Sequence, residues 1–138
     1  MRLACVALLL IVPAILADDK KDDKAPKARE ITATGLKVQG TVKGGLDKPA
    51  KATTKADLEK LLDKDSAEAV GKKVDFKKEY VLIFAWAGSG QDKLAMKVET
   101  TKKGDEAVFS YTRGRTRDLR RHLKVYAIPT KTTYKVGK

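Results

Sequence analysis

The chain has 138 residues, and its 30 Lys and Arg against 18 Asp and Glu give it a formal net charge of +12 at pH 7. This length is enough for one domain with a sizeable core. The one cysteine, Cys5, and the one histidine, His122, exclude a disulfide framework and a Cys/His metal site. The positive charge is compatible with binding to nucleic acid, acidic polysaccharide or anionic lipid, and equally with a soluble lysine-rich surface.

Residues 1–17 have the pattern of a secretory signal peptide. Arg2 gives a charged start, the following residues are apolar apart from one proline, and Ala17 precedes the charged run that begins at Asp18. A retained membrane anchor is the alternative, but the apolar run falls short of the ~20 residues that a span needs. We therefore expect a secreted or periplasmic protein with no transmembrane span after processing and, because Cys5 is removed, no thiol.

The segment Asp18–Arg29 has no large apolar residue and mixes both charge signs. Such a segment buries too little surface to offset its ordering entropy, so we expect a flexible leader. The remainder, residues 30–138, is predicted to form a single domain.

Polar and apolar residues alternate through Glu30–Val42, with an interruption near Gly35. Alternation of this kind predicts one bent strand or two short ones. Gly44, Gly45 and Pro49 then mark a loop.

A helix is predicted after this loop. Thr54 and Asp57 form a capping-box pattern, in which a hydroxyl at the N-cap is followed three residues later by an acid. An apolar stripe with helical spacing follows, formed by Leu58, Leu61 and Leu62. We expect one helix of about three turns that rests on the sheet and ends before Gly71.

The run Tyr80–Ala87 contains no charge, glycine or proline, and its β-branched and aromatic residues predict a strand buried on both faces. Leu82 and Phe84 are the residues expected deepest in the core. The segment Gly88–Asp92 has the composition of a turn, and Lys93–Glu99 alternates between apolar and polar residues. We expect these two strands to form a hairpin at the centre of a sheet.

Further strands are expected at Glu106–Thr112, at Leu123–Ile128 and, at an edge of the sheet, at Thr132–Val136. One helix followed by a run of antiparallel strands predicts the α+β class. The expected fold is a single domain with a mainly antiparallel sheet, either a sandwich or a partly open barrel, and one helix packed on it.

No constellation of residues predicts catalysis. His122 stands among cations, and neither Ser89 nor Ser110 has a spacing that pairs it with this imidazole. One histidine without a cysteine gives no metal-ligand cluster, and the scattered acids show no glycosidase spacing. The segment Gly88–Gly90 lacks the third glycine and the lysine of a phosphate-binding loop, so it is predicted to be a hairpin turn. We expect no enzyme activity, no metal and no cofactor.

The most unusual stretch is Arg113–Lys124, RGRTRDLRRHLK, which has six cations and one acid, Asp118. Arginine pairs well with carboxylate, phosphate or sulfate, so one interpretation is a contact with a polyanion or a partner. The other interpretation is a solvated connection, with Thr116–Arg121 as one helical turn in which Asp118 pairs with Arg121. The candidate contact residues are Arg113, Arg115, Arg117, Arg120, Arg121 and Lys124.

Several short pieces share a layout with a known family. They are an early strand with a central glycine at Thr34–Leu36, the segment Val74–Phe76 directly before the long apolar strand, and a late strand that closes at Ile128 and Pro129. In this layout the chain resembles the small exported bacterial domains similar to the C-terminal domain of the PrcB protease-complex subunit. The resemblance implies a non-enzymatic domain that supports or stabilises a partner protein.

The chain departs from that family after the main strand. There the family is rich in glycine with an aromatic residue, as in Thr-Gly-Gly-Tyr, whereas this chain has Gly88–Leu94. A hydrolase has almost no support in the sequence, so two functions stay open. One is an exported, non-catalytic domain that interacts with an unidentified protein in the cell envelope or outside the cell. The other is a module that binds an acidic polymer, nucleic acid or acidic polysaccharide, through residues 113–124.

Overall fold

The computed structural model describes residues 25–40 and 45–137. The predicted signal peptide (1–17) and most of the predicted leader (18–29) lie outside these ranges. In the part of the chain that is described, no helix is both long enough and apolar enough to cross a membrane.

The structure is α+β, as predicted, with two sheets and two short helices. The elements are β1 (Arg29–Glu30), β2 (Ala50–Ala52), α1 (Lys55–Leu61), α2 (Lys64–Gly71), β3 (Glu79–Ser89), β4 (Lys93–Thr101), β5 (Gly104–Thr112), β6 (Leu119–Pro129) and β7 (Thr133–Val136). The first sheet has the order β1-β6-β3-β2 and is antiparallel throughout. The second has the order β4-β5-β7, with β7 parallel to β5.

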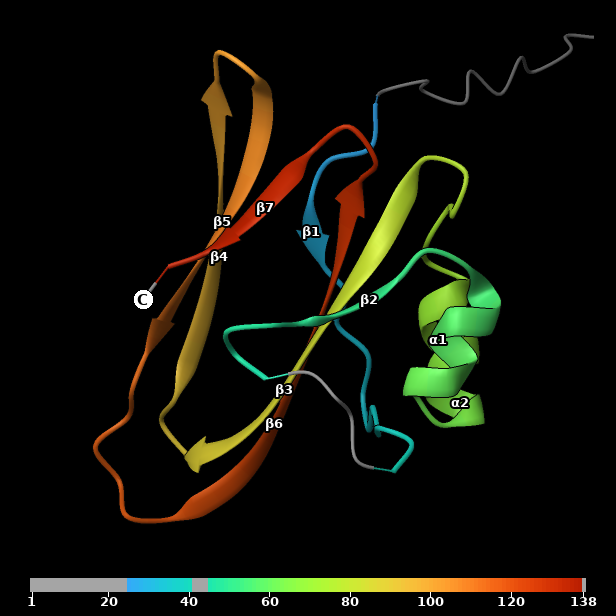
Figure 1. The fold of residues 1–138 in the computed structure, drawn as a ribbon. Helices are drawn as coiled ribbons and strands as arrows, with labels where there is room; N and C mark the ends of the chain where they lie inside the picture. The colour runs from blue at the N-terminus through green and yellow to red at the C-terminus, as the bar shows by residue number, and fades with distance from the viewer. Residues whose placement is uncertain (1–24, 41–44, 138) are drawn as a thin grey trace, which may run out of the picture.

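The two sheets and the helices form layers. Figure 1 shows α1 and α2 on one side of the first sheet and the strands β4, β5 and β7 on the other. One cluster of buried side chains joins the helices to the first sheet, and a second cluster lies between the two sheets. The sheets do not close into a barrel, so the sandwich is the expected alternative that the structure supports.

The core is centred on β3. Alternate residues of this strand serve the two clusters: Val81 and Ile83 face the helices, whereas Leu82 and Phe84 face the second sheet. All four side chains are fully buried, which confirms the predicted two-sided burial. The Phe84 ring lies 4.7 Å from that of Phe109, measured between centroids, so aromatic packing joins the two sheets.

The predicted central hairpin is wrong, because β3 and β4 belong to different sheets. The strand β3 pairs with β2 and β6, and β4 pairs with β5. The segment Gly90–Asp92 therefore carries the chain from one sheet to the other. A strand buried on both faces needs a layer on each side and a partner on each edge, and β6 supplies the long partner that β4 was expected to be.

The single predicted helix is two helices. The capping box of Thr54 and Asp57 is present at the start of α1, as expected. The chain then becomes extended at Leu62, which bridges Val38, and Asp63 starts α2 by accepting a hydrogen bond from the Ser66 amide at 2.9 Å. The break occurs because an N-capping aspartate directly follows a leucine that is fully buried in the core.

The predicted strand region Glu30–Val42, of which residues 41 and 42 lie outside the described ranges, contributes two short pieces. Only Glu30 belongs to β1, and Val38 forms an isolated bridge. Between them Gly35 has a φ of +74°, which explains the interruption that the sequence shows there.

The ordered fold begins before residue 30. Arg29, the last residue of the predicted leader, lies in β1. Its guanidinium pairs with both carboxylate oxygens of Glu79, a side chain that is almost completely buried at the start of β3. The same guanidinium donates to the Lys73 carbonyl at 2.6 Å, and the Asp75 amide donates to Glu79 at 3.2 Å. This cluster attaches the entering chain to the central strand.

Candidate functional site

Two connections between the sheets meet at one end of the sandwich. The first runs from β3 to β4 through residues 89–92, which we name the sheet turn. The second runs from β5 to β6 through residues 113–118, which we name the arginine loop. Figure 1 shows the orange connection between β5 and β6 passing beside the end of β3. Their contact forms the candidate site.

The Asp92 carboxylate is the centre of this contact. One oxygen accepts a hydrogen bond from the Gly114 amide at 2.7 Å, and the other accepts from Tyr111 Oη at 2.8 Å and Trp86 Nε1 at 3.1 Å. The bond from Gly114 is the main cause that holds the Asp92 pKa below its ordinary value. Asp92 is itself buried, although it lies in a segment with the composition of a turn.

The rest of the arginine loop is bound to the sheet turn in the same way. The Thr116 amide donates to Ser89 Oγ at 3.2 Å, and the two hydroxyl oxygens lie 2.6 Å apart. The Gly90 amide donates to Asp118 Oδ1 at 3.1 Å. Hydrogen bonds from Thr116, from Gly90 and from Arg120 lower the pKa of Asp118 to about 2.

Three glycines permit this close approach. A Cβ at Gly88 would overlap the Asp92 carboxylate, and one at Gly90 would overlap that of Asp118. A Cβ at Gly114 would overlap both the side chain and the backbone of the sheet turn. Gly88 and Gly90, which the sequence predicted to form a hairpin turn, therefore serve the contact between two connections, as Gly114 does.

A stacked pair of rings lies next to the contact between the sheet turn and the arginine loop. The His122 ring stacks on Trp86 with a centroid distance of 4.8 Å and an interplanar angle of 14°. Its Nε2 lies 2.7 Å from the Ser89 carbonyl oxygen. The imidazole thus reaches the Ser89 backbone, while the Ser89 hydroxyl contacts Thr116. This geometry provides support for the turn and does not form a serine–histidine nucleophile pair.

The six predicted contact cations fall into two groups that differ in their surroundings. Arg113, Arg115 and Arg117 are exposed on the arginine loop, and none of them forms an ion pair with any described residue. Gly114, Thr116 and Asp118, the residues that alternate with them, hold the loop against the sheet turn. The arginine row is therefore carried on a fixed backbone.

The other three cations have different surroundings. Arg120 donates to Asp118 Oδ2 at 2.7 Å, and Lys124 pairs with Glu30. Arg121 is opposite Ala87 and borders a recess on the helix side of the sheet. The predicted helical turn at 116–121, with an Asp118–Arg121 pair, is wrong because β6 begins at Leu119.

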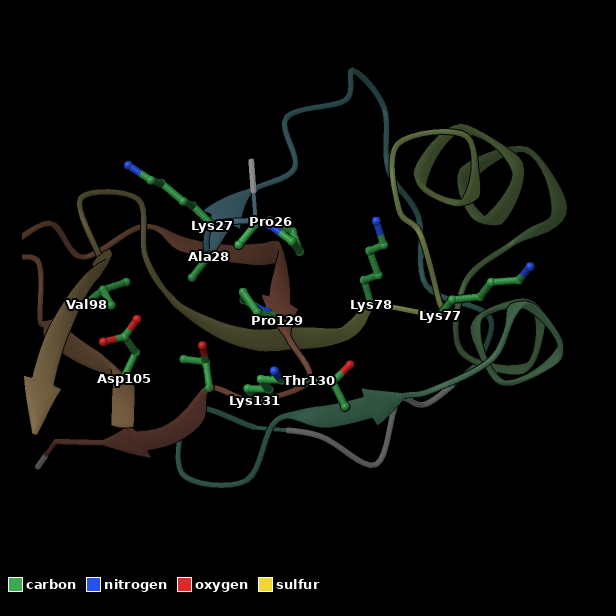
Figure 2. A pocket seen from close by; sticks show the side chains of 12 residues that line it. Pro26, Lys27, Ala28, Lys77, Lys78, Val98, Asp105, Pro129, Thr130 and Lys131 are labelled. Atoms are coloured by element: carbon green, nitrogen blue, oxygen red, sulfur yellow. The ribbon is translucent and has the colours of Figure 1, made fainter. Parts of the chain in front are cut away.

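The arginine loop borders a hollow of about 950 Å³, whose lining includes Asp92 and Tyr111. A second hollow, of about 750 Å³, lies at the other end of the sheets and has lysines and apolar residues in its lining. Figure 2 shows the side chains of Lys27, Lys77 and Lys78 extending away from the middle of that group. Since these lysines do not converge, the arginine loop is the stronger candidate site.

Among residues 25–40 and 45–137, no group of three or more His, Cys, Asp or Glu side chains could hold a metal ion. Comparisons with known protein families, with curated proteins and with solved structures gave no match for this chain. The candidate site is thus defined by its own geometry: a framework of hydrogen bonds that presents three arginines to solvent.

Proposed function

We propose that this chain is a non-catalytic binding domain that contacts an acidic partner through Arg113, Arg115 and Arg117. One observation carries the proposal. Every second residue of the loop is fixed against the sheet turn, and the arginines between them make no ion pair in the described structure. A connection that only joins two strands through solvent does not require these hydrogen bonds.

The framework lowers the cost of binding. A loop that is already ordered loses less conformational entropy when a partner arrives. Arginine adds the geometry for two parallel hydrogen bonds to a carboxylate, phosphate or sulfate group. The loop is consequently suited to recognising anionic groups.

The test is a binding titration at several salt concentrations. Fluorescently labelled polyphosphate, heparin and poly-glutamate are added to the protein at low salt, and affinity is followed as salt rises. The triple variant R113S/R115S/R117S should lose most of the affinity. The matched control K102S/K103S/K131S removes the same charge from exposed positions at the other end of the sheets and should retain it. Equal loss in both variants would contradict the proposal, since it would assign binding to net charge alone.

A second candidate function is contact with a protein by strand addition. The strand β4 pairs only with β5 in the described structure, so its other edge is open along nine residues. Val98 on this strand is 42% exposed. The resemblance to PrcB-like domains, which implies support of a partner protein in the envelope or outside the cell, favours the same class. Here Val98→Lys should weaken capture of a protein partner from an envelope extract, whereas R113S/R115S/R117S should not.

A further inference from the structure

The strand β4 is a long edge of the second sheet that has no partner on its outer side in the described structure. Of the strands at the sheet edges, β1, β2 and β7 have two, three and four residues, whereas β4 has nine. Figure 1 shows the hairpin of β4 and β5 extending beyond β7. Short strands, prolines and bulges protect an edge from pairing. The strand β4, KLAMKVETT, has no proline and pairs with β5 residue for residue, without a bulge, so its outer edge is competent to pair with another strand.

The accessible half of β4 is the half toward the hairpin tip. At the other end, Leu94 is buried between the sheets, and its carbonyl accepts a hydrogen bond from Tyr126 Oη at 3.3 Å. Every residue from Lys97 to Thr101 is exposed. Val98 is 42% exposed, although it lies opposite Ala107 on the face of the sheet that is turned to the core. A strand added at this end would therefore be centred near Val98 and would cover it.

The sequence around Val98 is complementary to itself. When two β4 strands are paired antiparallel with Val98 opposite its own copy, Lys97 of each chain stands opposite Glu99 of the other. Opposite charges that face one another directly across a strand pair stabilise it. If the centre of the pairing moved by one residue, to Lys97 or to Glu99, that residue would stand opposite its own copy and like charges would repel. The charges therefore favour the register in which the exposed Val98 is also covered.

The same pairing compensates an unfavourable arrangement within the chain. Glu99 lies directly opposite Glu106 of β5, and like charges in this position are destabilising. Within one chain Glu99 is paired with Lys97 of its own strand, with Nζ 3.4 Å from Oε1, and an exposed pair of this kind contributes little. A second copy of β4 would bring another lysine to the outer side of Glu99. The edge thus offers a charge that a second copy can compensate.

From the open edge, the exposed Val98 and the complementary charges, we infer that two copies of this chain associate by antiparallel pairing of their β4 strands, centred on Val98. The three-stranded second sheets of the two copies then form one continuous sheet, in the order β7-β5-β4-β4-β5-β7. This interface closes on itself, because both copies use the same edge and only the short β7 remains at each end. The inference rests on the second candidate function, strand addition at β4, and does not involve the arginine loop.

The first experiment measures the oligomeric state by sedimentation velocity from micromolar to millimolar protein. The net charge of +12 opposes association, so salt is kept at about 0.15 M to screen the repulsion. The protein should pass from monomer to dimer and no further. V98K, which places two like charges opposite one another, should stay monomeric, whereas Q39K, which adds the same charge at another exposed position, should dimerise. A wild type that stays monomeric would overturn the inference and leave the edge to a different protein, and a V98K protein that dimerises normally would overturn it too.

The second experiment exchanges the charges. K97E and E99K each place like charges opposite one another at two positions of the paired strands, so each should weaken the dimer by about tenfold. A mixture of the two variants restores opposite charges at both positions and should form a heterodimer more tightly than either variant forms a homodimer. K60E makes the same change of charge as K97E at an exposed position of α1 and should leave dimerisation unchanged. If the mixture associates no better than the separate variants, the inferred pairing is wrong.

A third experiment locates the two-fold axis. In a Cys5→Ser background, Val98→Cys places two thiols directly opposite one another, and mild oxidation should give a disulfide-linked dimer. Thr100 lies on the same face of β4, but in this register its two copies are offset by about 13 Å along the strands. Thr100→Cys should therefore stay unlinked, because a disulfide cannot span that distance. Equal crosslinking of the two variants would overturn the pairing centred on Val98.

Discussion

The Gly114 amide donates a hydrogen bond of 2.7 Å to the Asp92 carboxylate, and this bond joins the two connections that pass between the sheets at one end of the sandwich. The same carboxylate accepts from Tyr111 and Trp86, which belong to different sheets. A single side chain thus ties together both sheets and the arginine loop. Its removal leaves three donors without an acceptor.

Asp92→Ala is therefore expected to be clearly destabilising. Loss of an acceptor from partly buried donors costs more than loss of an exposed contact. Gln91→Ala, an exposed neighbour in the sheet turn, should change the free energy of unfolding by no more than about 0.5 kcal/mol. Urea unfolding of both variants checks this, together with the emission of Trp86, which loses its hydrogen bond only in Asp92→Ala. Equal midpoints for the two variants would contradict the assigned role.

Truncation of the central strand should have a large effect. Leu82 and Phe84 have no exposed surface, so Leu82→Ala or Phe84→Ala should cost about 2–5 kcal/mol through lost transfer free energy and an unfilled cavity. Ser110→Ala, at an exposed position of β5, serves as the control. Denaturant unfolding that gives the same midpoint for Ser110→Ala and Leu82→Ala would be inconsistent with this core.

The pair of Arg29 and Glu79 gives a third prediction. Arg29→Ala leaves the Glu79 carboxylate buried without its cation, at a cost of about 3 kcal/mol, the lower end for such pairs because Arg29 is itself partly exposed. The double variant Arg29→Ala/Glu79→Gln should recover part of that loss, since it removes the uncompensated charge. A double-mutant cycle measured by thermal unfolding tests the coupling. Additive effects would mean that the pair contributes nothing specific.

Acid should weaken the contact at Asp118. The folded pKa is about 2, below the unfolded value of about 4, so the stabilisation is present above pH 4 and is lost as pH falls toward 2. Asp118→Asn should flatten the dependence of the melting temperature on pH in this window. The shift for Asp92 has the same sign, so Asp92→Asn should flatten it as well. A steeper dependence of the melting temperature on pH in either variant would contradict the lowered pKa assigned to that aspartate.

Patterns of local sequence predicted the elements well and their partners poorly. The burial of Leu82 and Phe84, the cap at Thr54 and the strand at Glu106–Thr112 were all foreseen, because each depends on nearby residues. The pairing of β3 with β6 was missed, since alternation shows which face of a strand is buried and not which strand lies beside it. Long-range pairing is decided by the packing of the whole chain.

Only part of the candidate site could be predicted from the sequence. The arginines of RGRTRD indicate a contact with an anion, whereas the residues between them fit a solvated connection or a helical turn equally well. The alternation of arginine with Gly114, Thr116 and Asp118 was a signal in itself, because small and hydrogen-bonding residues at every second position fit a segment held along one side. The partners of this segment, above all Asp92, could not be found without the fold.

The pairing of β3 with β6 also sets the order in which the molecule can form. During synthesis, β3 emerges before β4 and β5, and neither of these strands pairs with it. One long edge of β3 therefore stays unpaired until β6 has been synthesised. The second sheet is likewise incomplete until β7, the last strand, reaches β5. Non-local pairing of this kind slows folding and exposes apolar strands in the meantime. We therefore expect the nascent chain to acquire its protease resistance only after Val136 has left the ribosome.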